Sequence, residues 1–373
     1  MYRQTWMEVN LDQITENVKK IKKICGKKII AVVKADAYGC GDQQVLRACV
    51  EGGAEMAAVS SLDEAVMLRN VGYAGEILIL GAVDPADVPQ LIVQHISTAA
   101  YSMEWVKMVT AKGCRGLSVH LAVDTGMNRI GFREIDEMKT ALGLLTGAGC
   151  DVDGIFTHFY CADVPDHRLT DLQSERFEKA VKALDYPFRW IHCDNSDAAL
   201  FHHDHFSNAC RIGITLYGIT GYENNLEHAV SLYSTVTMCK HIHAGDTVGY
   251  GATYTAKGDE IIITAPIGYA DGLIRANQGR HVYVDGCYGE IVGRVCMDQI
   301  MVKVDHEIPF GSVVEVFGPH ISIESMADDL HTIPYEVLCL ISPRVTRQYI
   351  YHGRTMEKNE RLLSSSNEDA IGQ

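Results

Sequence analysis

One lysine stands where an α/β enzyme would place a reactive amine. An apolar, largely β-branched run from Lys27 to Val33 has the character of a buried strand, and Lys34 follows it at the start of the turn Ala35–Gly39. Parallel α/β folds carry their chemistry at the carboxyl ends of such strands. Apolar surroundings favour the neutral amine, and a neutral amine forms a Schiff base with a carbonyl compound. A lysine that simply extends into solvent is the alternative interpretation.

Other polar clusters fall on or after later strand-like runs. They are Asp124–Arg129 (Asp-Thr-Gly-Met-Asn-Arg), Thr157–Phe159, His192–Ser196, Arg211–Ile214, Val248–Tyr254 and Arg294–Asp298. Taken singly, each has an ordinary structural explanation: Arg211 as an ion-pair partner, His158 as a core histidine, Tyr250 as a sheet aromatic. Their distribution over the ends of several strands, rather than at a single switch point, favours a barrel over an open sheet.

The elements that must position these residues alternate between strand-like runs and helix-like segments over the first 220 residues. A helical stripe of apolar residues lies at 11, 14, 18 and 21, and further helices are indicated at 61–69, at 168–184 and from Asp136 onward. Eight strand-like runs lie at 28–35, 55–60, 76–83, 95–101, 117–124, 154–160, 188–193 and 209–217. Such alternation indicates parallel βαβ units. Eight units of this length fit a closed (β/α)8 barrel, with an open doubly wound sheet as the competitor.

The pattern changes after about residue 225, where helices become rare. Turn residues separate strand-like runs at 229–242, 260–267, 281–285, 289–295, 299–304 and 312–317, and a short helix is predicted at 322–329. We therefore predict an α/β chain with a barrel over residues 11–225 and a mostly β domain over 226–355 together with 1–10. The polar segment 356–373 is predicted to be a flexible tail.

Composition and charge narrow the class of protein. The chain has 373 residues and a net charge of −15, which argues against nucleic acid and anionic membranes as partners. No apolar run reaches the length of a membrane span. The 12 cysteines include no Cys-x-x-Cys pair, so reduced thiols in the cytoplasm are expected. The segment His202–His205 and the pair His241 and His243 are interpreted as solvated, and no metal site is expected.

Taken together and in order, these motifs resemble those of the alanine racemase family. The motifs that carry the resemblance are Lys34-Ala-Asp-Ala-Tyr-Gly39, Asp124-Thr-Gly-Met-Asn-Arg129, Thr157-His-Phe159, His192-Cys-Asp-Asn-Ser196, Arg211-Ile-Gly-Ile-Thr-Leu-Tyr-Gly218, Tyr250-Gly-Ala-Thr-Tyr254, Gly268-Tyr-Ala-Asp-Gly272 and Cys296-Met-Asp298. Any one of them is weakly specific, whereas eight in the right order are a strong signal. The resemblance implies an isomerase of fold-type III that uses pyridoxal 5′-phosphate (PLP) to racemise alanine, with an N-terminal barrel and a C-terminal β domain.

The resemblance also implies roles in catalysis. Lys34 would hold PLP through a Schiff base and act as one base, and Tyr250 would act on the opposite face of the substrate carbon. His158 would support the phenolate of the tyrosine and pack on the cofactor ring. Arg211 can only donate hydrogen bonds, so it would face the pyridine nitrogen and leave it unprotonated. His192 would support Arg211.

Further residues are implied in binding. The other cofactor-binding positions, mostly around the phosphate, are Tyr38, Asn195, Ser196, Gly213 and Ile214. Arg129 would contact the phenolic oxygen of PLP and the substrate, and the backbone N–H of Met297 would hold the substrate carboxylate. Tyr250 and Met297 reach the partner's site in the family, so a head-to-tail homodimer is implied. Residues in support of the site or along its entry would be Asp163, Tyr269, Arg275, Arg294, Asp298 and Ile341.

Two positions depart from the pattern of the family. Ala122 stands where many members have a carbamylated lysine that orients the arginine matched by Arg129, so Arg129 would need another anion or would be freer to move. Pro343 stands where members usually have a tyrosine that narrows the substrate pocket. Both changes resemble those of racemases with broader specificity. We therefore expect a racemase of alanine that also accepts larger or polar amino acids, serine first, and that is either a separate protein or part of a longer, membrane-anchored one.

Three rival functions remain at this stage. A fold-type-III decarboxylase would need an acid, rather than Arg211, facing the pyridine nitrogen. A non-catalytic PLP carrier would consist of the barrel alone and would have no use for the domain that carries Tyr250. An unrelated barrel aldolase would use Lys34 for a Schiff base and would leave Arg211 and Tyr250 without a role.

Overall fold

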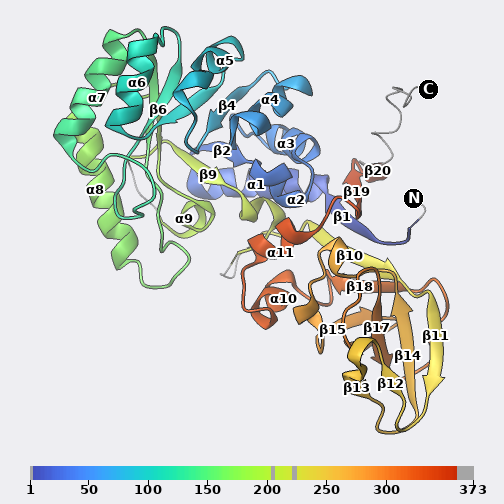
Figure 1. Ribbon diagram of the computed structural model, residues 1–373. Helices are drawn as coiled ribbons and strands as arrows, with labels where there is room; N and C mark the ends of the chain where they lie inside the picture. The colour runs from blue at the N-terminus through green and yellow to red at the C-terminus, as the bar shows by residue number, and fades with distance from the viewer. Residues whose placement is uncertain (1–2, 203–205, 221–224, 359–373) are drawn as a thin grey trace, which may run out of the picture. The chain divides into compact units, whose positions relative to one another are not determined.

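The structure, a computed structural model, describes residues 3–202, 206–220 and 225–358. It contains two compact units. One comprises Ile14–Ala37 and Asp42–Glu227, and the other joins the N-terminal segment up to Gln13 and residues Tyr38–Gly41 to the chain from His228 onward. The ribbon in Figure 1 gives the labels of the elements.

The first unit is a closed barrel of eight parallel strands, which confirms the predicted (β/α)8 architecture. Its strands are β2 (Lys28–Val32), β3 (Met56–Val59), β4 (Glu76–Ile79), β5 (Ser97–Ala100), β6 (Ser118–Ala122), β7 (Asp151–Phe156), β8 (Trp190–His192) and β9 (Ala209–Ile212). β2 pairs with β9 and closes the ring. Seven of the eight predicted runs therefore contain one strand of the barrel, and the run predicted at 154–160 overlaps β7, which begins three residues earlier at Asp151.

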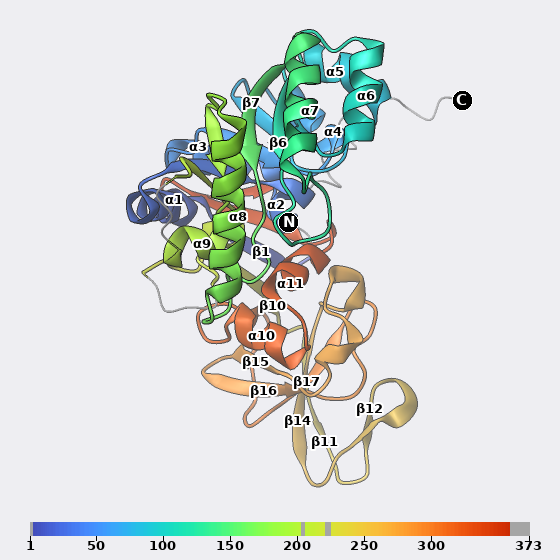
Figure 2. The same cartoon turned by 90° about the vertical axis from the view of Figure 1, so that its left-hand side faces the viewer.

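Helices cover the outside of the barrel. They are α1 (Leu11–Cys25), α3 (Asp42–Glu51), α4 (Leu62–Asn70), α5 (Val88–Val93), α6 (Met103–Lys112), α7 (Ile135–Gly147), α8 (Arg168–Leu184) and α9 (Ser196–Phe201). Figure 2 shows α6, α7 and α8 beside one another. The apolar stripe predicted for the first helix is real, because Leu11, Ile14, Val18 and Ile21 of α1 are fully buried.

The eighth predicted strand is too long. The structure keeps β9 only to Ile212 and then turns at Gly213 into a 3-10 helix, η2 (Ile214–Tyr217). Gly213 has φ −131° and ψ −80°, which lies outside both the strand and helix regions. The apolar character of this run reflects burial in both elements, and burial alone does not distinguish a strand from a helix.

The second unit is built on a ten-stranded sheet in the order β11-β14-β17-β16-β15-β18-β10-β1-β19-β20. Its strands are β1 (Trp6–Asn10), β10 (Val230–Thr235), β11 (Met238–Ile242), β14 (Glu260–Ala265), β15 (His281–Val284), β16 (Cys287–Ile291), β17 (Ile300–Val304), β18 (Val313–Phe317), β19 (Thr346–Tyr351) and β20 (Arg354–Lys358), with a separate pair β12 (Thr247–Val248) and β13 (Tyr254–Thr255). β1 pairs with β10 and with β19, which ties the N-terminal segment to this unit. The mostly β character predicted for this part of the chain is thus confirmed.

Short helices complete the second unit. The helix predicted at 322–329 is present as α10 (Ile323–Asp329), and α11 (Pro334–Leu340) follows it. Of the segment predicted to be a tail, residues 356–358 belong to β20, and 359–373 lie outside the described residues. Within the described part of the chain, no helix is long and apolar enough to cross a membrane.

Candidate active site

The lysine singled out in the sequence opens an unusual turn. Lys34 follows β2 and starts the one-turn helix α2 (Lys34–Gly39), in which Ala35, Asp36, Ala37 and Tyr38 all have positive φ angles of 51–59°. Left-handed helical backbone costs roughly 1–2 kcal/mol for each residue with a Cβ. Strain of this kind persists where the surrounding structure imposes it, commonly at functional sites.

Side chains of neighbouring elements hold this turn. The backbone N–H of Ala35 donates to Oε1 of Glu64 at 2.8 Å, and the N–H of Asp42 donates to Oδ1 of Asp36 at 2.9 Å. The other carboxylate oxygen of Glu64 accepts from the N–H of Ser60. These hydrogen bonds fix the backbone that follows Lys34, and Glu64 ties it to the residue after β3. Lys34 itself is exposed in the single chain, which differs from the apolar surroundings expected for its amine.

Arg211 lies inside the barrel, and its guanidinium is bonded to neutral acceptors. Nη1 donates to Nδ1 and to the backbone oxygen of His192, at 2.9 and 3.0 Å. Nη2 donates to the backbone oxygens of Thr157 and Cys193, at 2.8 and 3.1 Å, and to Nδ1 of His158 at 3.1 Å. Only 4% of Arg211 is exposed. Among the described residues, none accepts a hydrogen bond from its Nε–H, and that nitrogen is not sealed in the core.

These contacts assign the protons of three histidines. An arginine has no acceptor, so Nδ1 of His192 and Nδ1 of His158 must both be unprotonated. The proton of His192 is then on Nε2, from which it is donated to Nδ1 of His120 at 2.9 Å. His120 in turn carries its proton on Nε2, and this buried N–H has no partner among the described residues. The result is a directed chain from Arg211 through His192 to His120.

Burial keeps all three rings neutral. Burial, reinforced by the positive charges of Arg211, Arg129 and Lys34, lowers the pKa of His158 to about 3. Burial also lowers the pKa of His120 to about 4 and the pKa of His192 well below its ordinary value. The same effect lowers the pKa of Arg211 to about 10, which still leaves the guanidinium charged at neutral pH.

The predicted phosphate residues of the barrel also lie together. Ser196 begins α9, and its Oγ accepts a hydrogen bond from the backbone N–H of Gly213 at 3.0 Å. Asn195 caps α9 through the N–H of Ala198 and donates to the backbone oxygen of Phe159. The hydrogen bond between Gly213 and Ser196 therefore joins the segments that follow β8 and β9, the seventh and eighth strands of the barrel. Tyr38 belongs to the other unit, where its buried ring packs edge-on against Tyr335.

The space beside Ala122 is filled by apolar side chains. Ala122 is 1% exposed and packs with Ala99 and Phe156, with Tyr101 and Leu80 against the cluster. Arg129 itself is exposed, and no described residue forms an ion pair with it. The neighbouring carboxylate of Asp124 is engaged by Arg133 at 3.0 Å.

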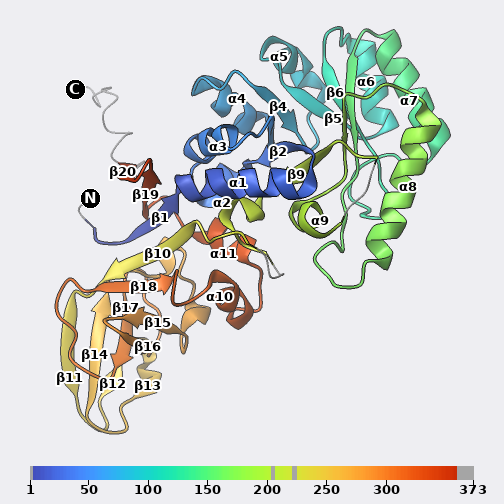
Figure 3. The ribbon, with the colours of Figure 1, turned by 180° about the vertical axis from the view of Figure 1, so that it is seen from behind.

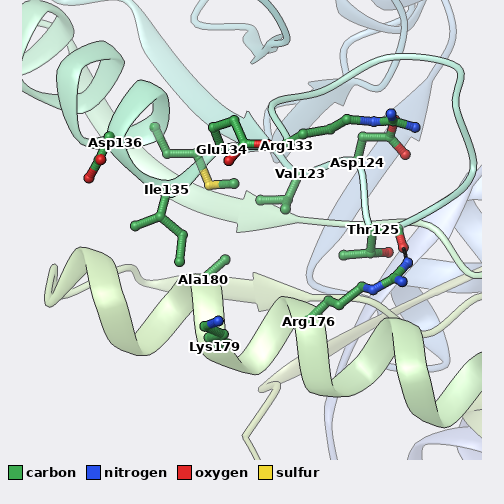
Figure 4. A pocket seen from close by; sticks show the side chains of 11 residues that line it. Val123, Asp124, Thr125, Arg133, Glu134, Ile135, Asp136, Arg176, Lys179 and Ala180 are labelled. Atoms are coloured by element: carbon green, nitrogen blue, oxygen red, sulfur yellow. Dashed lines mark hydrogen bonds and ion pairs between the residues drawn. The ribbon is translucent and has the colours of Figure 1, made fainter.

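A pocket lies beside the segment 123–125, on the outside of the barrel and between α7 and α8 (Figure 4). Arg133, Arg176 and Lys179 line it together with Asp124 and Glu134. Its charges are therefore mixed, and Arg176 is already bonded to the backbone oxygen of Thr125 at 2.8 Å. None of the predicted site residues lines this pocket.

Sequence analysis missed two residues that position the site. Gln173 of α8 is 1% exposed, donates to Oγ1 of Thr125 and the backbone oxygen of His158, and accepts from the N–H of Tyr160. The sequence signal that could have revealed Gln173 is its position on the buried face of an amphipathic helix. The second missed residue is His120, a histidine within the mostly apolar strand β6. A Cβ on Gly154, its partner on β7, would lie 2.4 Å from Nδ1 of His120, so only glycine fits there.

The remaining predicted residues belong to the second unit, apart from Asp163, which is exposed in the barrel unit. Tyr250 is 71% exposed and Met297 51% exposed in the single chain. Tyr269 begins a 3-10 turn, and its N–H donates to the backbone oxygen of Cys296 at 3.0 Å, beside Met297. Arg294 packs over Gly251, beside Tyr250, and Asp298 pairs with Arg344 at 2.6 Å. Arg275 begins the 3-10 helix η5, and Ile341 is buried.

Two of the histidines interpreted as solvated, His241 and His243, are exposed and ion-paired. The interpretation is wrong for His202, because only 11% of its side chain is exposed and its ring packs edge-on against Phe159. His241 pairs with Glu307 at 2.8 Å and His243 with Asp259 at 2.9 Å, whereas residues 203–205 lie outside the described part of the chain. A search of the described residues finds one group with three possible metal ligands within 4.8 Å of one another, namely Cys287, Asp305 and His306.

Comparison with known proteins matches both units to one family. The N-terminal domain of alanine racemase matches residues 9–221, and the C-terminal domain matches residues 229–349. An alanine racemase of Streptococcus pyogenes is 42% identical over 362 residues, covering 93% of this chain and 99% of that protein. The crystal structure of an alanine racemase from Bacillus anthracis with bound L-Ala-P has a TM-score of 0.92 at 36% identity, over 97% of this chain and 99% of that one. A histidine racemase from Leuconostoc mesenteroides subsp. sake has a TM-score of 0.87 at 30% identity, over 94% and 99% of the two chains.

Proposed function

The chain belongs to the alanine racemase family and is an isomerase of that type, and we propose that it interconverts L- and D-alanine by two bases, Lys34 and Tyr250. Racemisation needs a proton removed from one face of the substrate carbon and a proton delivered to the other. A lysine amine held at a strand end and a tyrosine from a second element meet that need. The family uses PLP, and we propose that this chain binds it.

The barrel residues fit PLP. Lys34 would bind the aldehyde carbon, Ser196, Gly213 and Ile214 would hold the phosphate with Tyr38, and Arg129 would contact the phenolic oxygen. Arg211 and His158 would lie against the ring, with Asn195 nearby. When bound, PLP supplies an electron sink that acidifies the proton on the substrate carbon.

Arg211 is the observation that carries the proposal. Its guanidinium is bonded to carbonyls and neutral imidazoles and keeps its Nε–H available. A guanidinium has no acceptor for an N–H, so a ring nitrogen that faces it must itself be the unprotonated acceptor. A ring nitrogen without a proton is a weaker electron sink, which favours simple proton exchange over side reactions. A decarboxylase would need an acid at this place, so the same observation argues against that rival.

The exposure of Tyr250 supports a shared site. A catalytic tyrosine with 71% of its surface open in the single chain needs a second surface to exclude water from it, and a partner subunit would supply one. We propose a head-to-tail homodimer in which Tyr250 and Met297 complete the partner's site. None of the twelve cysteines forms a disulfide in the structure, which supports the proposed cytoplasmic location.

Chiral product analysis of the PLP-loaded protein tests the activity. Lys34→Ala should abolish conversion of either alanine enantiomer, and Tyr250→Phe should lower it by roughly 10²–10⁴-fold. Mixing the two inactive variants tests the shared site, because a mixed dimer contains one site with both bases intact. Equal mixing should restore about a quarter of wild-type activity. No recovery after proven subunit exchange would place both bases of a site on one chain, and unchanged activity of Lys34→Ala would refute the mechanism.

A broader substrate range is the second candidate. Apolar packing at Ala122, an unpaired Arg129 among the described residues and Pro343 in place of a bulky tyrosine all favour a less restricted pocket. The related histidine racemase shows that this fold also serves a larger side chain in another protein. The test compares alanine, serine, lysine, arginine and histidine in wild type and Pro343→Tyr. The loss of a pocket wall changes discrimination by about 1–3 kcal/mol, so the variant should favour alanine about tenfold or more over wild type. Equal preference in the two proteins would exclude Pro343 as the cause.

A further inference from the structure

Two cysteines of the barrel lie close enough to react with each other. Cys25 is the last residue of α1, Cys210 lies on β9, and their sulfur atoms are 3.6 Å apart. Figure 3 shows the C-terminal end of α1 beside β9. Cys210 is fully buried, whereas Cys25 is partly exposed. A disulfide has a sulfur–sulfur distance of about 2 Å, so a shift of less than ~2 Å is enough to form one.

The chain directly after Cys25 is loosely packed. The next residue, Gly26, has a φ of 65°, and a side chain added there would meet nothing within 4 Å. Cys210, in contrast, is held in β9, where it pairs with Ile29 of β2. The end of the helix can therefore move toward a strand that stays in place.

The surroundings of Cys25 favour its thiolate. The hydrogen-bonding contact with Cys210 is the largest influence, and with the backbone and charge of Lys27 it lowers the pKa of Cys25 to about 7, against the opposing effects of burial and of the Asp194 carboxylate. The same hydrogen bond, with burial, raises the pKa of Cys210 well above its ordinary value. Lys27 is itself fixed by Asp194 at 2.6 Å and Ser207 at 2.7 Å. A partly exposed thiolate beside a protonated thiol is the arrangement of a reacting and a resolving cysteine.

We propose that Cys25 and Cys210 form an oxidation site that hydrogen peroxide converts into a disulfide. The Cys25 thiolate, formed by release of the Cys25 proton to solvent, attacks one peroxide oxygen. The O–O bond breaks, and the departing hydroxide takes up a proton from solvent to become water. The Cys210 sulfur then attacks the sulfenic sulfur of Cys25. The S–O bond breaks, and the hydroxyl leaves as water with the proton of Cys210. Two thiols lose two electrons in total, and one peroxide yields two waters.

A second pair in the same barrel provides an internal comparison. The sulfur atoms of Cys114 and Cys150 are 2.9 Å apart, closer than those of the proposed site. Both residues are buried, and burial together with the contact to Cys114 raises the pKa of Cys150. If the sulfur–sulfur distance alone decided the order, peroxide would oxidise Cys114 and Cys150 before Cys25 and Cys210. Because both thiols are buried and the thiolate of Cys150 is disfavoured, we expect this pair to be oxidised after Cys25 and Cys210.

The proposed site adjoins the buried arginine. Cys210 directly precedes Arg211, whose backbone N–H donates to the oxygen of Asp194 at 2.9 Å. The carboxylate of Asp194 binds Lys27, two residues after Cys25. Closure of the disulfide would therefore covalently join the end of α1 to the strand that carries Arg211.

Peptide mapping of the PLP-loaded chain after graded peroxide treatment tests the proposal. The first disulfide formed should link the peptides of Cys25 and Cys210, and dithiothreitol should reverse it. Cys114 and Cys150 should still be alkylated after unfolding. In Cys210→Ser, which lacks the resolving thiol, dimedone should trap Cys25 as a sulfenic acid. In Cys25→Ser, Cys210 should remain a thiol.

Cys239→Ser is the matched control, because Cys239 is a partly exposed cysteine on β11 of the other unit. This variant should form the Cys25–Cys210 disulfide at the wild-type peroxide concentration. The proposal is overturned if Cys114 and Cys150 are linked first. It is also overturned if Cys25 stays reduced at peroxide concentrations that oxidise Cys239. Because Cys25 is partly exposed, the Cys25→Ser protein should fold, which circular dichroism verifies.

Discussion

The histidines of the barrel and those of the second unit have pKa values shifted in opposite directions. In the barrel, His120, His158 and His192 are buried beside a guanidinium, and burial lowers the pKa of each. In the second unit, His228 and His306 have carboxylate partners, Glu324 and Asp305, and the hydrogen bonds to these partners raise their pKa values. The same side chain is thus held neutral as an acceptor in one unit, whereas its charged form is favoured in the other.

The difference shows how the barrel keeps a charged arginine in its interior. A carboxylate would neutralise Arg211, but it would also compete for the N–H that the proposed cofactor needs. Neutral imidazoles and carbonyls satisfy the guanidinium and leave its positive charge uncompensated. Desolvation is the reason that these rings serve as acceptors, since protonated rings would have no lone pair to offer.

Removal of the arginine should have the largest effect on this arrangement. Arg211→Met removes one donor from each of two imidazole nitrogens and three carbonyls of the barrel, of which the His192 carbonyl keeps the N–H of Thr157. Each unsatisfied buried acceptor costs about 1–3 kcal/mol, so we expect a loss of at least about 3 kcal/mol in the free energy of unfolding, measured by urea denaturation. Arg211→Lys, which keeps the charge and three donors, is the control and should lose less. A Met variant as stable as wild type would mean that Arg211 is not part of a satisfied network.

The direction of the hydrogen-bond chain predicts unequal roles for two histidines. His192→Leu removes an acceptor for Arg211 and a donor to His120, which should destabilise the fold by roughly 2 kcal/mol. His120→Leu removes only the last acceptor, and it also eliminates an N–H that has no partner among the described residues. We expect its cost to be about 1 kcal/mol smaller. Thermal unfolding of the two variants, with the same replacement in each, decides the order, and a reversed order would contradict the assigned tautomers.

The sequence predicted the barrel because alternation of elements is a local, repeated signal. The strand ends likewise indicated Lys34, Arg211 and His158, whose chemistry is unusual for a strand. His120 and Gln173 were not predicted, because a single polar residue in a buried run carries no sign of its partner. Their roles depend on contacts such as that of His120 with His192, 72 residues away. Nor could spacing show that Ala35–Tyr38 adopt left-handed backbone, since none of these residues favours it.

Acid should weaken the barrel through its neutral histidines. Their folded pKa values lie below the unfolded value near 6.5, so the unfolded state binds more protons as the pH falls below that value, and stability is lost with acidification. Each such histidine contributes at most about 1.4 kcal/mol per pH unit between its folded pKa and about 6.5. Urea unfolding from pH 7 to pH 5 should show this slope, and His120→Leu should reduce it by up to one histidine's share. An unchanged slope in that variant would mean that His120 is protonated in the folded state.

The paired histidines of the second unit should respond with the opposite sign and a smaller size. The pKa of His228 is raised by Glu324, whose carboxylate lies 3.0 Å from its Nε2. A raised folded pKa gives stability that is present below the unfolded value and is lost as the pH rises through the folded pKa. His228 is 40% exposed, so screening limits the contribution to about 1 kcal/mol or less. His228→Gln should therefore be slightly less stable than wild type at pH 5.5 and equal to it at pH 8, with less difference in high salt. If the loss of stability in His228→Gln instead grew toward pH 8, His228 would be neutral in the fold. It would then not differ from the buried histidines of the barrel.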